Sequence, residues 1–246
     1  MLCLLRQLIG AKVYSEGQTI GEVSDFFFDH RTWAIQFFLI RVGGLFRQKS
    51  ILIRPSQIES MDGLAAFTLK DNVMEQSLIL DRDYSGHYRW PYYWTGAGVL
   101  GIATHSEINH WGIAPQARMK LLARDQTNGQ AIGIDSFNGI LDFRIESLGT
   151  LVGYLEDFVI DTRKWKISYL VIRSLPSPTQ KTSILPPEWI ETIQWNDLSI
   201  RFSMKEEVIL KSPEFHSKIL ANPYQMKNFE NALWQYYQIP RIKDAS

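Results

Sequence analysis

Two aspartates and two arginines are the residues of this sequence whose spacing best suits shared chemistry. Asp25 and Arg41 recur as Asp157 and Arg173, each 132 positions later. Both members of each pair have the same parity about an expected hairpin turn, so an even register places them on one face of a sheet. We therefore predict a structural ion pair or a barrel-lining contact between the aspartate and the arginine in both halves of the chain.

The sequence offers no recognisable catalytic or metal-binding set. His105, Glu107 and His110 lie close together, but their spacing fits no compact zinc pattern. The one cysteine, Cys3, is distant from them, and only Arg6 nearby carries the positive charge that activates a thiol. A Gly-x-Ser-x-Gly run, a phosphate-binding loop and a His-Glu-x-x-His run are absent from the sequence. We therefore expect no enzymatic activity, no cofactor and no catalytic, cofactor-binding or metal-binding residue.

The charge balance argues against a nucleic acid as the partner. The 246 residues include 26 Lys and Arg against 26 Asp and Glu, so the formal net charge is zero. Non-specific nucleic-acid binding depends on an excess of cations, so strong nucleic-acid binding is not expected. The 45% hydrophobic content is ample for a buried core. A single cysteine fits a reducing compartment, which leads us to expect a cytoplasmic protein.

An internal repeat organises the chain, and such repeats decide the fold. Shifting the sequence against itself by 132 positions keeps one register, without a gap, from Gly17 to Glu59. The identical pairs include Gly17/Gly149, Gly21/Gly153, Asp25/Asp157, Phe26/Phe158, Asp29/Asp161, Arg31/Arg163, Trp33/Trp165, Ile35/Ile167, Arg41/Arg173, Lys49/Lys181, Pro55/Pro187, Ile58/Ile190 and Glu59/Glu191. We call residues 5–80 the first copy and residues 137–212 the second copy. The predicted domains are 1–80, an aromatic-rich linker at 81–136, a second domain at 137–212 and a helical tail at 213–246.

Each copy is predicted to consist of β-strands. In the first copy, β-rich runs at 20–28 and 33–42 flank a polar turn at 29–32, which is the pattern of a hairpin. The aspartate that opens this turn in each copy can accept a hydrogen bond from the backbone two residues on. Five or six short strands in each copy suit a small closed barrel, because closure removes exposed edges.

Two glycines of each copy have expected backbone roles. Gly17 and Gly149 are predicted to supply a positive φ in a turn. Gly21 and Gly153 are predicted to mark a bulge or a close approach of two backbones.

These residues resemble the PRC-barrel family, named for the cytoplasmic domain of the photosynthetic reaction centre H subunit. The resembling run is Gly-x-x-x-Gly-x-Val/Leu-x-Asp, which ends at Asp25 in the first copy and at Asp157 in the second. The turn aspartates, the hairpin tryptophans and the Ile-Leu-Ile-Arg-Pro and Ile-Leu-Pro-Pro segments add to the resemblance. It implies two PRC-type barrels in tandem, used as a non-catalytic module for protein interaction or assembly.

The resemblance also implies more specific roles. A position at the cytoplasmic face of a membrane complex, or a reaction-centre-like role in photosynthetic electron transfer, would follow the H subunit, with Asp25 as a proton-relay carboxylate. A role in ribosome maturation would follow RimM, in which a similar barrel docks on a ribosomal protein. These 246 residues show no stretch like the N-terminal membrane helix of the H subunit and no evident RimM-type partner domain, so neither specific role is expected to carry over directly. The partner is expected to be a protein, of unknown identity.

Aromatic residues gather between the two copies and again near the end of the chain. Those of the linker are Tyr88, Trp90, Tyr92, Tyr93, Trp94 and Trp111. They either pack against a barrel or form a surface for a protein or membrane interface. From Asn222-Pro223, the spacing of Met226, Phe229 and Leu233 predicts an amphipathic helix that extends up to Pro240. This helix packs on the second barrel or exchanges into a second chain, which would make a homodimer.

Overall fold

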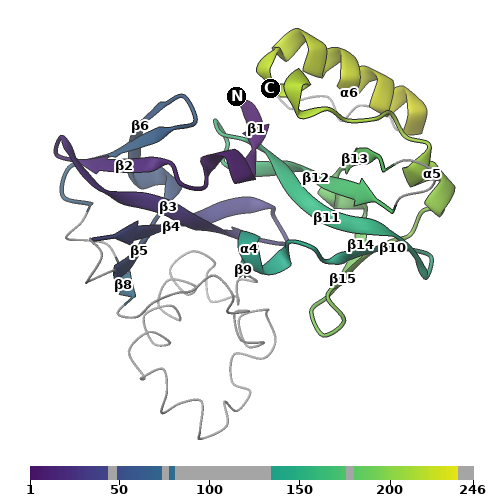
Figure 1. Cartoon of the computed structure of the whole chain (residues 1–246), viewed down its shortest axis with the longest axis horizontal. Helices are drawn as coiled ribbons and strands as arrows, with labels where there is room; N and C mark the ends of the chain where they lie inside the picture. The colour runs from purple at the N-terminus through teal and green to yellow at the C-terminus, as the bar shows by residue number, and fades with distance from the viewer. Residues whose placement is uncertain (44–48, 74–77, 81–133, 176–179, 238–246) are drawn as a thin grey trace, which may run out of the picture. The chain divides into compact units, whose positions relative to one another are not determined.

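The computed structural model of the chain describes residues 1–43, 49–73, 78–80, 134–175 and 180–237. Strands dominate these residues and helices are few, consistent with the predicted all-β class (Figure 1). No helix within these ranges is both long and apolar enough to cross a bilayer. The chain divides into two compact units. Unit 1 combines Met1–Arg6 with Ile140–Ser246, and unit 2 is Gln7–Gly139.

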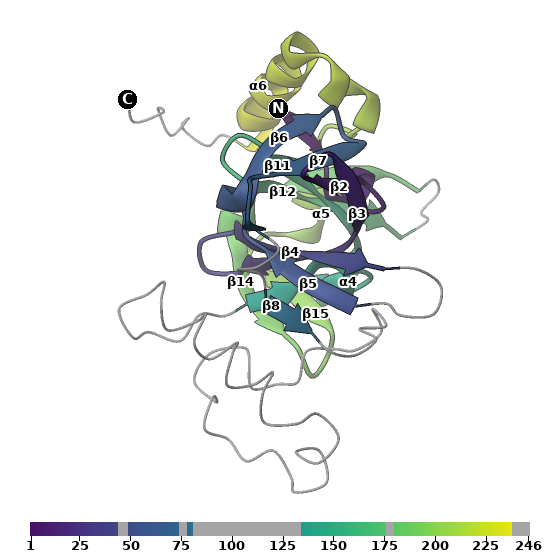
Figure 2. The same ribbon diagram turned by 90° about the vertical axis from the view of Figure 1, so that its left-hand side faces the viewer.

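The first-copy strands form the sheet of unit 2, which is turned toward the viewer in Figure 2. Its elements are β2 (Lys12–Ser15), β3 (Gln18–Asp29), β4 (Ala34–Val42), β5 (Lys49–Ile53), η2 (Pro55–Gln57), β6 (Ile58–Asp62), β7 (Ala66–Leu69), β8 (Leu78–Leu80) and β9 (Ile134–Ser136). The strand order is β6-β7-β2-β3-β4-β5-β8, and β9 pairs with the last residues of β3. The β2–β7 pair is parallel and the other pairs are antiparallel. Large apolar residues, among them Phe26, Phe38 and Phe67, fill its core.

The second-copy strands form the sheet of unit 1. Its elements are β1 (Leu2–Leu4), β10 (Arg144–Ser147), β11 (Thr150–Asp161), β12 (Lys166–Ser174), β13 (Thr182–Leu185), η4 (Pro187–Trp189), β14 (Ile190–Gln194), β15 (Ser199–Phe202), α5 (Glu206–Leu210), η5 (Ser217–Ala221) and α6 (Pro223–Tyr237). The strand order is β14-β15-β10-β11-β12-β13, and β1 pairs with the last residues of β11. Strands β10 to β12 have the bounds of β2 to β4 shifted by 132 residues.

The strand orders bear on the expected barrels. In unit 2 the end strands of the order are β6 and β8, and in unit 1 they are β14 and β13. Among the strands described, no pairing joins the two ends in either unit, so each sheet is open. The observed architecture is therefore two strand-rich units with open sheets, and the two closed barrels in tandem stay a prediction.

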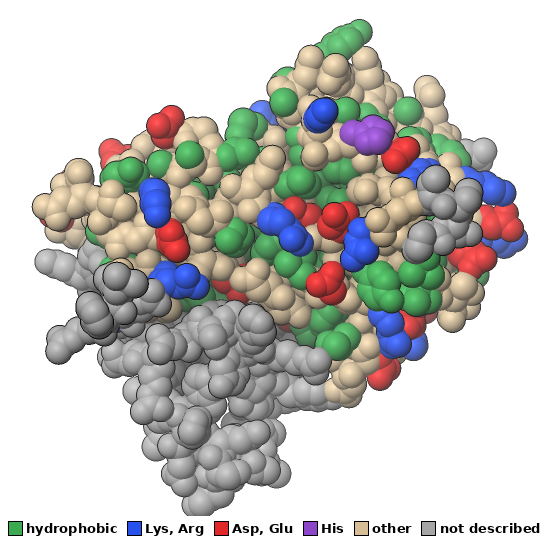
Figure 3. Space-filling view, in the orientation of Figure 1, with side chains coloured by type: hydrophobic (Ala, Val, Ile, Leu, Met, Phe, Trp, Pro, Cys, Tyr) green, Lys and Arg blue, Asp and Glu red, His purple; other side chains and the backbone are tan. Residues whose placement is uncertain are grey.

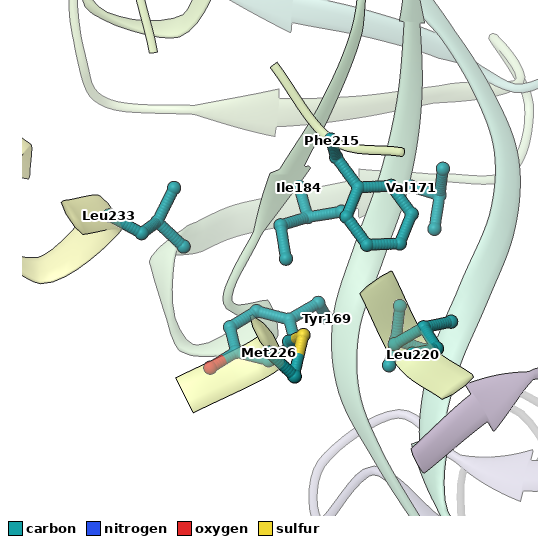
Figure 4. Close-up of a cluster of buried hydrophobic side chains, with 8 residues drawn as sticks. Tyr169, Val171, Ile184, Phe215, Leu220, Met226 and Leu233 are labelled. Atoms are coloured by element: carbon teal, nitrogen blue, oxygen red, sulfur yellow. The ribbon is translucent and has the colours of Figure 1, made fainter. Parts of the chain in front are cut away.

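The predicted C-terminal helix is present as α6, which ends at Tyr237. Met226 and Leu233 of α6 are buried, together with Phe215 and Leu220, against Val159, Tyr169, Val171 and Ile184 of the second-copy strands (Figure 4). The Tyr169 hydroxyl donates a hydrogen bond of 2.9 Å to Glu230 Oε1 of the helix. The apolar face of the helix that the sequence predicts therefore packs on the second copy. Exchange of α6 into a second chain stays a prediction.

The glycine predictions are confirmed. Gly17 and Gly149 have φ values of +76° and +87°. A Cβ atom built on Gly21 would lie 2.0 Å from the Arg41 carbonyl oxygen, and one on Gly153 would lie 2.2 Å from that of Arg173. Both distances are shorter than any non-bonded contact, so only glycine lets the two hairpin strands approach this closely.

Replacing Gly153 by alanine should lower the free energy of unfolding of unit 1 by about 1–3 kcal/mol, because the added methyl group forces the β11 and β12 backbones apart. Gly149→Ala is the matched control, since its Cβ would meet no atom within 4 Å and only the positive φ is strained. That strain costs about 1–2 kcal/mol. Urea unfolding followed by circular dichroism measures both, and a Gly153→Ala chain as stable as the wild type would contradict the observed approach.

The two units divide the chain differently from the expected domain ranges. Met1–Arg6 was expected in one domain with the first copy, yet it groups with residues 140–246. Residues 134–139, which fall at the expected linker and the start of the second copy, group with the first-copy strands. Each unit therefore contains a short segment that precedes the main strands of the other copy in sequence.

Candidate functional site

The repeated aspartates Asp25 and Asp157 each lie at a β-bulge. The β3–β4 register shifts between Val23 and Asp25, so that Ser24 is the extra residue. The β11–β12 register shifts at the equivalent place, with Glu156 as the extra residue. A bulge leaves the backbone groups of the extra residue without a ladder partner. Both aspartates therefore have beside them a carbonyl group that can accept a hydrogen bond.

Asp25 is fully buried and binds the segment that follows β9. Its Oδ1 accepts the backbone N–H of Phe26 at 2.8 Å and that of Asn138 at 3.1 Å. Its Oδ2 accepts the Ser136 hydroxyl at 2.6 Å. The Asn138 side-chain amide donates to the Ser24 carbonyl at 3.0 Å, which satisfies the bulge. The carboxylate and the bulge carbonyl therefore act together as one acceptor for residues 136–138.

Asp157 is buried in the same way and binds the segment that follows β1. Its Oδ1 accepts the backbone N–H of Phe158 at 2.7 Å and that of Arg6 at 3.1 Å. Arg6 Nε lies 3.8 Å from Asp157 Oδ2, and Arg6 Nη2 donates to the Glu156 carbonyl at 2.7 Å. Arg6 thus contacts both the carboxylate and the bulge carbonyl.

The two acceptors correspond residue by residue at the shift of 132. Arg6 corresponds to Asn138, and each donates its own backbone N–H to the aspartate and a side-chain N–H to the carbonyl before it. The strands that precede them correspond as well, since β1 pairs with β11 as β9 pairs with β3. We call these the Asp25 acceptor site and the Asp157 acceptor site. Each binds a strand followed by a turn whose N–H groups point at a buried carboxylate.

The predicted ion pairs between Asp25 and Arg41 and between Asp157 and Arg173 are wrong. Arg41 stands opposite Glu22 in the ladder, and its Nη1 lies 3.7 Å from Glu22 Oε1. Arg173 stands opposite Tyr154, and its Nη2 lies 3.8 Å from Asp142 Oδ1. Asp25 stands opposite Leu39 and Asp157 opposite Val171. The extra residue at each bulge shifts the register and brings Glu22 and Tyr154 opposite the two arginines. Both aspartates are buried, and their hydrogen-bond donors come from residues 136–138 and from Arg6 in place of the two arginines.

Burial dominates the electrostatics of the Asp157 acceptor site. Loss of solvent raises the pKa of Asp157 from its ordinary 3.8 to about 6, although the N–H groups of Phe158 and Arg6 and the Arg6 charge oppose the shift. The carboxyl group therefore titrates near neutral pH.

In unit 2, a histidine forms a hydrogen bond with the strand β9, which pairs with β3. His30 Nδ1 lies 2.6 Å from Oδ2 of the buried Asp135 on β9. This hydrogen bond raises the pKa of His30, and burial raises the pKa of Asp135 against the effect of the same bond. The pair ties β9 to the turn that follows β3.

The turn aspartates behave as the sequence predicts. Asp29 Oδ1 accepts the backbone N–H of Arg31 at 2.9 Å, and Asp161 Oδ1 accepts that of Arg163 at 3.1 Å. The guanidinium group of each arginine also donates hydrogen bonds to the same carboxylate. These contacts stabilise the hairpin turns and account for the repeated pairs Asp29/Asp161 and Arg31/Arg163. Lys, Arg, Asp and Glu side chains are interspersed on the described surface that faces the viewer in Figure 3.

Some sequence predictions fall outside the described residues. The aromatic residues Trp90 and Trp94, and the possible metal ligands His105, Glu107 and His110, lie within 81–133. The same segment contains a Gly-x-Gly-x-x-Gly run from Gly96 to Gly101, a spacing that indicates a dinucleotide site only when it joins a strand to a helix. Cys3 is described and buried, and burial raises the pKa of its thiol to about 12.

The sequence predictions did not include the two segments that fill the acceptor sites. A weak signal was present, because extending the shift of 132 upstream pairs apolar residues: Leu2 with Ile134, Leu5 with Phe137, and Leu8 with Ile140. These pairs are similar rather than identical, so they do not stand out beside the glycines and aspartates further on.

Comparison with known families gives one finding. Residues 4–62 match the model of the PRC-barrel domain. The PRC-barrel match covers most of the first copy, including Gly17, Gly21 and Asp25. A search of curated proteins finds no match to the chain. PRC-barrel domains serve in general as protein-interaction or assembly modules, and the match supports that general assignment.

Proposed function

We propose that this chain is a non-enzymatic assembly protein built from two PRC-type barrels in tandem, and that it binds a protein partner in the cytoplasm. The PRC-barrel match supports the first barrel, and the shared element bounds support a second of the same type. One observation carries the proposal: the most buried carboxylates of the repeat are used to hold segments of polypeptide. Chemistry on a small substrate would need such groups to be accessible instead.

Within the chain, segments are held by strand addition combined with a buried acceptor. Main-chain pairing supplies affinity, and the carboxylate selects a segment that turns its N–H groups inward after the strand. In the Asp25 acceptor site three donors converge on one carboxylate. A fold that holds chain segments in this way suits assembly.

Affinity capture of the full-length chain from its own cells tests the proposal. We expect a protein partner that co-purifies in a fixed ratio and withstands moderate salt. A double Trp90→Ala, Trp94→Ala chain reports whether the linker aromatics form the partner surface. Tyr224→Ala is the matched control, because Tyr224 is an exposed aromatic residue of α6, 72% accessible. A chain that elutes alone from every fraction would contradict the proposal.

The same experiment separates the specific alternatives. Sedimentation with pigmented membranes would favour the reaction-centre-like role and a place at the cytoplasmic face of a membrane complex. Co-purification with ribosomal subunits at moderate salt would favour the RimM-like role. No observation on the described residues favours one of these roles over the other, so the general assembly role is the one we propose.

A further inference from the structure

The two acceptor sites are filled reciprocally. The segment that leads into the first-copy strands, Met1–Arg6, occupies the Asp157 acceptor site in the second copy. The segment that leads into the second-copy strands, residues 134–139, occupies the Asp25 acceptor site in the first copy. Each of the two equivalent segments therefore binds to the copy that it does not lead into. This is the connectivity of a strand-exchanged dimer of two identical subunits, present here within one chain.

The contacts that hold Met1–Arg6 come from that segment and from unit 1. Leu2, Cys3 and Leu4 pair with Asp161, Ile160 and Val159. Leu2 and Leu4 pack on the apolar cluster that α6 covers, and β1 lies beside the end of β11 near α6 (Figure 1). Arg6 completes the site at Asp157 and Glu156. None of these contacts requires the segment and the site to belong to the same polypeptide.

We propose that the Asp157 acceptor site also takes Met1–Arg6 from a second copy of this chain, which gives a homodimer in which each chain donates this segment to the other. In the homodimer, Met1–Arg6 makes the same contacts with the acceptor site as in the single chain. The free energies of the two forms therefore differ mainly by the entropy lost when two chains associate. The hinge between Arg6 and the start of β2 at Lys12 is short, and short hinges favour exchange between chains. This inference deepens the proposed assembly function and rests on it for its biological meaning.

The proportion of homodimer follows from concentration. A segment joined by a short linker has an effective concentration of about 1 mM at its own site. At a chain concentration of about 0.1 mM, roughly one chain in ten should therefore exchange its segment with another chain. The proportion should rise when the chain concentration rises.

A mixed-disulfide experiment on full-length chains tests the proposal. Cys3 is the one cysteine and stands directly opposite Ile160 in the ladder. An untagged wild-type chain supplies Cys3, and a tagged Cys3→Ser, Ile160→Cys chain supplies the partner thiol. The two are unfolded together in urea and refolded at about 0.1 mM with oxidised glutathione as the oxidant. Refolding is needed because the Cys3 thiol is buried in the folded chain. Non-reducing electrophoresis then reports the covalent heterodimer.

In an equal mixture we expect a heterodimer from about one chain in twenty, because about one chain in ten exchanges and about half of these meet a chain of the other kind. The proportion should rise with concentration. A tagged Cys3→Ser, Ile200→Cys chain is the matched control, because Ile200 is equally buried but lies on β15, which does not pair with β1. A heterodimer no more abundant than in this control overturns the proposal. If Ile160→Cys does not fold, Leu4→Cys and Val159→Cys, each in a Cys3→Ser chain, give the same test at the next pair in the ladder.

A single chain with Cys3 and Ile160→Cys tests the placement of β1 itself. We expect an internal disulfide at low concentration. Failure of this bond to form in a folded chain would remove the acceptor site and overturn the proposal. Neither readout depends on an external partner, so the proposed function can fail in affinity capture while the exchange is still observed.

Discussion

Replacing Asp25 by alanine should lower the free energy of unfolding of unit 2 by about 3–5 kcal/mol. The change leaves three donors without an acceptor: the backbone N–H groups of Phe26 and Asn138, and the Ser136 hydroxyl. Each buried donor left unsatisfied costs about 1–3 kcal/mol, and these costs are offset in part because the cost of burying the carboxyl group is also removed. Urea unfolding followed by circular dichroism measures the loss.

Two further variants separate the acceptor role of Asp25 from general disruption of the strand. Asp25→Asn keeps an oxygen of the same shape, so it should lose less than half as much stability as Asp25→Ala. Ser24→Ala removes one hydrogen bond, from the Ser24 hydroxyl to the Leu39 carbonyl, and should cost about 1 kcal/mol. An Asp25→Ala chain that loses no more stability than Ser24→Ala would show that the carboxylate does not hold residues 136–138.

The second large effect is a pH dependence at Asp157. Its folded-state pKa of about 6 lies above the ordinary 3.8, so the folded chain retains this proton more tightly than the unfolded chain. The resulting stability is fully present below about pH 4 and is lost as the pH rises through about 6. A shift of about 2 units corresponds to about 3 kcal/mol.

Asp157→Asn should abolish this dependence because the amide does not titrate. Its free energy of unfolding, relative to the wild type, should rise by about 3 kcal/mol between pH 4 and pH 7. Asp161→Asn is the control of opposite sign. Burial raises the pKa of Asp161, but the hydrogen bonds from Arg163 outweigh it and hold that pKa below its ordinary value. The stability from Asp161 is therefore lost as pH falls. A pH-independent difference between wild type and Asp157→Asn would contradict the burial of this carboxylate.

The sequence allowed the repeated elements to be predicted because their causes are local. Glycine is required at Gly21 and Gly153 because the two backbones approach too closely for any side chain. The turn aspartates accept hydrogen bonds from backbone N–H groups two positions on. The helix from Pro223 follows from its proline start and its apolar spacing. These features depend on residues that are neighbours in the chain or in one hairpin.

The partners of Asp25 and Asp157 could not be predicted in the same way. The ladder partner of Arg41 depends on a bulge, and a parity count from the turn does not reveal a bulge. The true partner residues of Asp25 lie more than a hundred positions away in the sequence. The strand β9 has three residues, and a sequence pattern this short does not predict which strand it pairs with.

Hydrogen–deuterium exchange of full-length wild-type, Asp25→Ala and Asp157→Ala chains tests most directly the claim that each copy holds the segment preceding the other. We predict that Asp157→Ala speeds amide exchange in residues 1–6 and leaves residues 134–139 protected. Asp25→Ala should expose residues 134–139 and leave residues 1–6 protected, even if all of unit 2 loosens. Loss of protection in residues 1–6 in the Asp25→Ala chain, with protection kept in the Asp157→Ala chain, would show that the segment belongs to the first copy and would contradict the account.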